Sequence, residues 1–105
     1  MYGTTLLAAS LLFGAPAGSI FGDVKLGDKY LPELPLTLTC GAEAVEGKTD
    51  KAGSFRLTVK SGGRCTLGVS YEGQTATLDV VVFEKPAQYR LVLELKDGKY
   101  VLRRV

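Results

Sequence analysis

The chain has 105 residues, the size of one domain. Its 13 Lys and Arg nearly balance 11 Asp and Glu, and the net charge of +2 does not predict binding to nucleic acid or to an anionic membrane. The sequence contains no histidine, which excludes a Ser-His-Asp or Cys-His catalytic base and an imidazole metal site.

The N-terminal segment differs in kind from the rest, because no charged side chain precedes Asp23. Leu6–Phe13 is an apolar run that is too short to span a bilayer. It is followed by Ala15-Pro16-Ala17, which matches the small-residue cleavage site of a secretory signal peptide.

We therefore expect residues 1–18 to be a signal peptide and residues 19–105 to be one domain of an extracellular or periplasmic protein. The mature form would then have no integral membrane span. Met1–Thr5 lacks the Lys or Arg that usually opens a signal peptide, so a retained membrane anchor stays open as the alternative.

Alternation of apolar and polar residues predicts eight short strands and no helix. Turn residues separate the strands, above all Thr49–Gly53 and Asp97-Gly98, and Leu31–Pro35 is expected to be extended because each proline disfavours helix in the residue before it. Strands at this spacing predict an all-β sandwich of two sheets. The expected strands cover residues 19–26, 36–40, 42–48, 55–59, 65–71, 76–83, 89–95 and 100–102.

Both cysteines lie on the apolar faces of their strands. An antiparallel pairing that sets Cys40 opposite Cys65 also sets Leu38 opposite Leu67, and a slip of one residue would destroy this match. Residues directly opposite one another lie within disulfide reach. We predict a Cys40–Cys65 disulfide if the protein is exported, with two free buried thiols as the alternative.

Two hairpins support the same register. A tight turn at Tyr71–Gln74 would place Leu67 opposite Leu78, and Asp97-Gly98 is the strongest hairpin motif in the chain. One further inward face is expected on the strand before the second turn. It consists of Tyr89, Leu91, Leu93 and Leu95.

The strand before Glu84 breaks the alternation. Val81 and Phe83 are apolar on a face that should be polar, and we predict that they form a patch for self-association or for a protein partner. If the strand lies at a sheet edge, its free backbone groups would also invite pairing. In the alternative interpretation, the loop Leu31–Leu34 covers both side chains within one molecule.

Motifs for a reaction or a cofactor are weak. Gly41–Thr49 has five residues between its glycines, where a phosphate-binding loop needs four, and no helix follows it. Asp50 near Glu46 lacks the further ligands of a calcium site. We expect Glu43, Glu46 and Glu72 to be solvated, and we predict no catalytic residue, metal or cofactor.

Three short motifs resemble a known family. Gly22-x-Val24, then Thr49-Asp50-x-x-Gly53-x-Phe55, then Tyr71-x-Gly73 resemble the carboxypeptidase regulatory-like domains and other transthyretin-like sandwiches over residues 19–105. The resemblance implies an antiparallel Greek-key sandwich of seven or eight strands, with strands C-B-E-F in one sheet and D-A-G-H in the other. The segments LTLTC and GGRCTL also resemble pollen extensin-like secreted proteins, which place a disulfide similarly.

These observations predict an exported, non-catalytic β-sandwich module for protein contact or structural support. The alternative is a carbohydrate-binding accessory domain, which the resemblance implies because sugar-binding domains share this fold. A sugar site needs exposed aromatic rings, and only Tyr30 and Phe83 are expected to be exposed. The other aromatic residues of the strands are expected to face inward: Phe55, Tyr71, Tyr89 and Tyr100.

Overall fold

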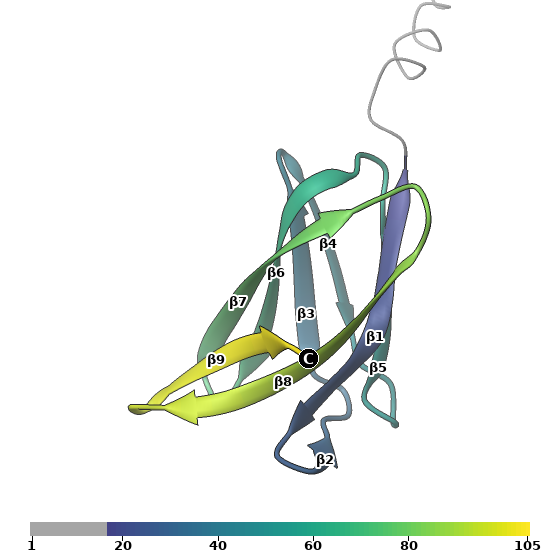
Figure 1. Ribbon diagram of the computed structural model, residues 1–105. Coiled ribbons are helices and arrows are strands. Elements are labelled where there is room, and N and C mark those ends of the chain that lie inside the picture. The colour runs from purple at the N-terminus through teal and green to yellow at the C-terminus, as the bar shows by residue number, and fades with distance from the viewer. Residues whose placement is uncertain (1–16) are drawn as a thin grey trace, which may run out of the picture.

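A computed structural model describes residues 17–105 as two packed β-sheets (Figure 1). No helix long and apolar enough to cross a membrane is present in this part of the chain. The predicted signal peptide falls almost wholly on residues 1–16, which lie outside the described residues. The strands are β1 (Gly18–Leu26), β2 (Lys29–Tyr30), β3 (Pro35–Cys40), β4 (Glu43–Lys48), β5 (Ser54–Val59), β6 (Gly63–Tyr71), β7 (Gln74–Val82), β8 (Ala87–Lys96) and β9 (Lys99–Arg104).

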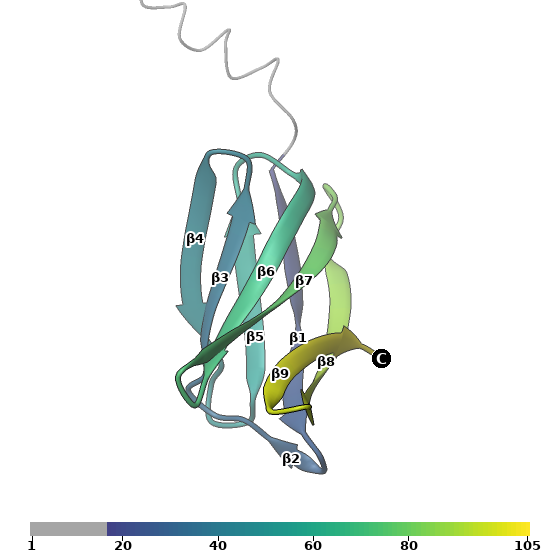
Figure 2. The same cartoon turned by 90° about the vertical axis from the view of Figure 1, so that its left-hand side faces the viewer.

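The first sheet has the order β4-β3-β6-β7, and all its strand pairs are antiparallel (Figure 2). Leu38 lies opposite Leu67, as the matching of apolar faces predicts. The same register brings Cys40 and Cys65 together with their Cα atoms 4.3 Å apart, and their sulfur atoms are bonded. The predicted disulfide is therefore confirmed, and this sheet is the expected C-B-E-F sheet.

The second sheet contains β5, β1, β8 and β9 in this order, with the short β2 paired to the end of β1. This is the expected D-A-G-H order. One pair departs from the expected antiparallel arrangement, because β1 and β8 run parallel. A crossover connection is needed to bring two parallel strands together, and here the whole of the first sheet provides it.

Both predicted hairpin turns are present. Glu72-Gly73 has φ values of 51° and 77°, and Asp97-Gly98 has φ values of 52° and 80°. Positive φ at both central residues matches the right-handed twist of the flanking strands. The cross-strand pairs are those predicted, including Leu67 opposite Leu78.

The core lies between the two sheets and is built from the inward side of each alternating pattern. Within the second sheet, the close pairing of β1 and β8 depends on Gly22, since a Cβ atom there would overlap the Tyr89 carbonyl oxygen on β8. The buried side chains include Ile20, Val24, Leu36, Leu38, Phe55, Leu57, Val59, Leu67, Val69, Val80, Val82, Tyr89, Leu91, Leu93 and Leu102, together with both cysteines.

Two local predictions are wrong. Leu31–Leu34 is not extended but turns at Pro32-Glu33, where Glu33 has a φ of 53°. Leu95 was expected to face the core, yet it is 60% exposed. Leu95 lies close to the turn of the β8–β9 hairpin, and the tip of this hairpin extends past the body of the sandwich (Figure 1).

Candidate functional site

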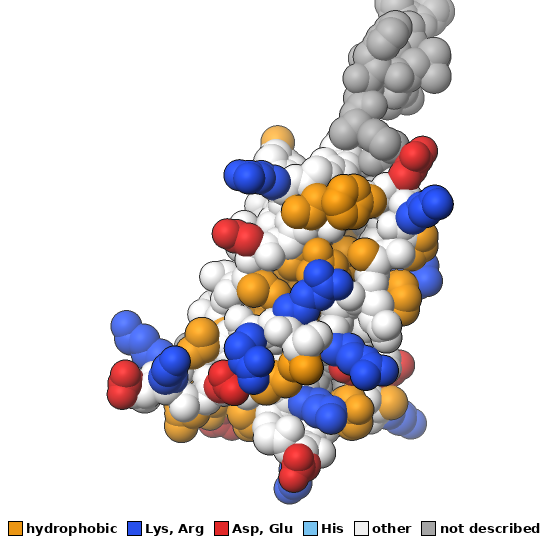
Figure 3. Space-filling view, in the orientation of Figure 1, with side chains coloured by type: hydrophobic (Ala, Val, Ile, Leu, Met, Phe, Trp, Pro, Cys, Tyr) orange, Lys and Arg blue, Asp and Glu red, His pale blue; other side chains and the backbone are white. Residues whose placement is uncertain are grey.

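The end of β7 presents two apolar side chains to solvent. Strand alternation turns Val80 and Val82 into the core, and Val81 and Phe83 therefore point outward. Val81 is 37% exposed and Phe83 is 60% exposed. Figure 3 shows hydrophobic side chains gathered in the upper part of this face, over the end of β7.

The loop Leu31–Leu34 does not cover these side chains. Leu34 is buried in the core, and Leu31 is packed against it beside β2. β2 lies at the opposite end of the sandwich from the end of β7 (Figure 1). Shielding by this loop, the alternative to a contact patch, is therefore not seen within residues 17–105.

An open groove with a volume of about 730 Å³ lies beside Phe83. Its walls come from two connections, one between β5 and β6 and one between β7 and β8. Glu84 and Lys85 are its charged members, and both are exposed. We name the whole surface the end patch. It consists of Val81 and the groove residues Gly62, Gly63, Val82, Phe83, Glu84, Lys85, Pro86 and Ala87.

Close packing shapes one wall of the groove, and side-chain hydrogen bonds hold the other. A Cβ atom at Gly18 would overlap the Phe83 carbonyl oxygen, so the absence of a side chain there lets β1 run close under the end patch. On the other wall, the Glu43 carboxylate accepts hydrogen bonds of 2.9–3.1 Å from the backbone N–H groups of Lys60 and Ser61. Glu43 was expected to be solvated, but it positions the β5–β6 connection.

The edge of β7 is less open than the sequence predicts. The Tyr89 hydroxyl accepts a hydrogen bond from Val81 N–H and donates one to the Val81 carbonyl, both at 3.2 Å. The Arg104 guanidinium lies over the Tyr89 ring at 3.9 Å. At the start of β7, the Gln74 side chain bonds to the backbone of the β8–β9 hairpin, including Tyr100 N–H at 2.9 Å. A strand from a partner therefore cannot pair with the backbone of Val81. Contacts made by the end patch must come from its side chains.

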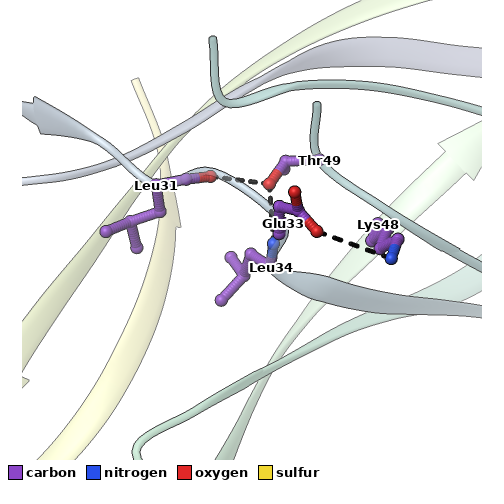
Figure 4. Close-up of polar contacts among 5 residues, drawn as sticks. All are labelled: Leu31, Glu33, Leu34, Lys48 and Thr49. Carbon is purple, nitrogen blue, oxygen red and sulfur yellow. Dashed lines mark hydrogen bonds and ion pairs between the residues drawn. The ribbon is translucent and has the colours of Figure 1, made fainter. Parts of the chain in front are cut away.

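The Thr49–Phe55 motif, which carries the family resemblance, has a structural role. The buried Thr49 hydroxyl accepts a hydrogen bond of 2.8 Å from Leu34 N–H and donates one of 2.6 Å to the Leu31 carbonyl (Figure 4). An exposed ion pair of 3.6 Å between Glu33 and Lys48 lies beside it. Thr49 thus ties the Leu31–Leu34 turn to the end of β4.

Asp50 caps the turn that follows. Its Oδ1 atom accepts hydrogen bonds of 2.9 Å from the backbone N–H groups of Ala52 and Ser54. Gly53 closes the turn with a φ of 80°. Across residues 17–105, no cluster of three His, Cys, Asp or Glu side chains is placed to hold a metal ion.

The outer face of the second sheet carries paired charges. Arg56 lies over the Phe21 ring at 5.5 Å, and Lys25 lies over the Tyr30 ring at 4.9 Å. Arg103 donates hydrogen bonds to Glu94, which lower the pKa of that carboxyl and raise the pKa of the guanidinium. These cations therefore have partners within the domain.

Sequence reasoning identified Val81 and Phe83 but missed the rest of the end patch. Ser61–Gly63 and Glu84–Pro86 are recognisable as connections between strands. In the C-B-E-F and D-A-G-H arrangement, both connections lie at the same end of the sandwich. The expected strand order therefore places these two segments next to one another.

The sheet orders C-B-E-F and D-A-G-H, with the parallel β1–β8 pair and the inward disulfide, define a transthyretin-like β-sandwich. Comparison with solved structures agrees. A 5-hydroxyisourate hydrolase from Klebsiella pneumoniae superposes with a TM-score of 0.56 at 14% identity, over 84% of this chain and 93% of that one.

A DUF3823 family protein from Parabacteroides merdae superposes with a TM-score of 0.58 at 11% identity, over 86% of this chain. The match spans 47% of the DUF3823 protein, so this chain corresponds to about half of that protein's length. No protein-family model and no curated protein matches the sequence. Since both identities are low, the likeness shows the fold alone.

Proposed function

We propose that this domain is a non-catalytic module of an exported protein and that it makes protein contacts through the end patch. The observation that carries the proposal is the 60% exposure of Phe83 beside an open groove. Large apolar side chains that stay exposed next to a groove on a small domain are typical of interaction sites. The hydrogen bonds that Glu43 accepts from the β5–β6 connection support this assignment, because a connection already held in place needs less ordering on binding.

The size of the end patch favours a weak, reversible contact. At the observed exposures, burying Val81 and Phe83 would contribute about 4 kcal/mol, and this already includes part of the groove because Phe83 is one of its walls. Association costs at least about 4 kcal/mol. The net gain through this surface alone is therefore small, and a stronger complex would need further contacts around it.

Export is supported by the disulfide. Both cysteines are buried and bonded in a small β domain, which is compatible with an oxidising compartment. The motifs that resemble carboxypeptidase regulatory-like domains support an accessory role, since Thr49, Asp50 and Gly53 shape turns in this structure.

The non-catalytic assignment rests on the side chains that this chain offers. It has no histidine, and both thiols are bonded to one another. One structural neighbour is a hydrolase by name, but at 14% identity only its fold is informative here. For carbohydrate binding, the alternative, Tyr30 and Phe83 lie at opposite ends of the sandwich and do not form one aromatic surface (Figure 1).

Affinity capture with the full chain tests the proposal. We compare the parent with Phe83→Ser and with the control Tyr30→Ser, which removes an exposed aromatic side chain at the opposite end. Partners retained by the parent and by Tyr30→Ser should be lost with Phe83→Ser, while all three proteins unfold at similar temperatures. If Phe83→Ser retains the same partners, the end patch is not the contact surface. Retention on a polysaccharide resin that Tyr30→Ser abolishes would favour the carbohydrate alternative.

A further inference from the structure

The rim of the groove carries two adjacent opposite charges. Glu84 and Lys85 follow Phe83 directly, and both are exposed. Neither takes part in an ion pair within residues 17–105. Figure 3 shows one acidic and one basic side chain beside the hydrophobic cluster, over the connection that follows β7.

This order of residues is self-complementary under two-fold symmetry. In a two-fold interface, if one residue contacts a second, the second contacts the first in the other copy. When two Phe83–Lys85 segments meet antiparallel, Glu84 of each copy faces Lys85 of the other. Since Phe83, Glu84 and Lys85 line the groove in each copy, the phenyl ring of one copy then lies beside the groove of the other. Pockets of about 300–1,000 Å³ accept drug-sized ligands, and the groove of about 730 Å³ therefore has room for this ring.

We infer that the end patch binds a second copy of this chain, with Phe83 inserted into the opposite groove and two reciprocal Glu84–Lys85 ion pairs at the rim. The inference rests on the proposed function and names its partner. The Tyr89 hydroxyl occupies the edge-facing backbone groups of Val81, so the copies associate through side chains and not by extending the sheet.

Charge exchange between two variants tests the pairing. Glu84→Lys leaves two adjacent cations on the rim, and Lys85→Glu leaves two adjacent anions. Each variant alone repels its own copy across the two-fold axis, whereas a mixture restores both attractive pairs. Because the end patch offers a small contact area, self-association is measured by sedimentation equilibrium of the full chain up to about 1 mM, where a Kd of about 10⁻⁴ M gives mostly dimer.

The parent should self-associate, and each charge variant alone should bind its own copy about tenfold more weakly. An equimolar mixture of the two should form a heterodimer within about threefold of the parent Kd. Phe83→Ser should be monomeric at every concentration, whereas Tyr30→Ser should match the parent. Equal thermal unfolding of all five proteins shows that folding is unchanged.

Several results would overturn the inference. A parent that stays monomeric at about 1 mM rejects self-pairing. The proposed contact function would still hold in that case if Phe83→Ser loses a partner that the parent retains in affinity capture. Equal association of the parent and Phe83→Ser places the interface elsewhere and rejects both proposals. A mixture as weak as the separate charge variants rejects the reciprocal ion pairs and therefore this mode of pairing.

Discussion

Removing the Cys40–Cys65 disulfide should destabilise the domain by several kcal/mol without changing its fold. The two cysteines are separated by 25 positions in the sequence, and closing a loop of this length in the unfolded chain corresponds to about 3.5 kcal/mol at 25 °C in the chain-entropy model. The register on either side is set independently by apolar pairs such as Leu38–Leu67. We therefore expect the double variant Cys40→Ala/Cys65→Ala to keep its strands and lose about 2–5 kcal/mol.

Urea unfolding followed by far-UV circular dichroism measures this loss. For a domain of this size, 1 kcal/mol corresponds to about 4–8 °C, so the midpoint of thermal unfolding should fall by roughly 15–25 °C. The urea dependence should also steepen, because the unfolded chain expands when the cross-link is absent. The parent treated with reductant until both thiols are free serves as the control and should behave like the double variant.

Intact mass with and without reductant completes the test. The protein purified from an oxidising compartment should accept an alkylating reagent at Cys40 and Cys65 only after reduction. Two reactive thiols before reduction would contradict the disulfide. A double variant within about 1 kcal/mol of the parent would refute the loop-entropy reasoning even if the bond is present.

Three further predictions concern single side chains. Tyr89→Phe removes the hydroxyl that hydrogen-bonds to both backbone groups of Val81, so the free energy of unfolding should fall by about 1–2 kcal/mol. The Val81 amide should also exchange its hydrogen faster, as measured by NMR. Unchanged protection of this amide would contradict the prediction. Gly22→Ala forces a Cβ atom against the β8 backbone, so the free energy of unfolding measured in urea should fall by about 1–3 kcal/mol or more. An unchanged free energy of unfolding would mean that the sheet adjusts freely. The pKa of Glu94 is lowered by Arg103, so its contribution to stability is present above the ordinary carboxyl pKa and is lost as pH falls through the lowered value. Because the pair is exposed, Glu94→Gln should not change the thermal midpoint at pH 7 measurably, and a clear drop would show that it matters more than its exposure indicates.

Much of this fold can be predicted from local pattern. Period-two alternation identifies inward residues, and two cysteines on inward faces leave one register for their strands. The misses have one common cause, which is that they depend on distant elements. Whether Leu95 is covered depends on the reach of the opposite sheet, and the turn at Glu33 depends on the Thr49 hydroxyl.

The same reasoning explains what could be predicted of the candidate site. The outward direction of Val81 and Phe83 follows from alternation alone. The groove beside them is built by connections far apart in the sequence, and the Tyr89 hydroxyl that occupies the edge of β7 comes from the other sheet. A single sequence contains no local pattern that specifies such contacts between sheets.

The central position of β1 has a consequence for when the domain can fold. β1 lies between β5 and β8, and its parallel pairing joins Ile20 to Ala87 near the two ends of the domain. Contacts between such distant residues are slow to form, because a long loop must close before they can stabilise the fold. During synthesis, β1 is made first and cannot complete its sheet until β8 is made. Until β8 is made, Ile20 and Val24 on β1 lack their β8 neighbours and stay available to any chaperone that recognises apolar segments.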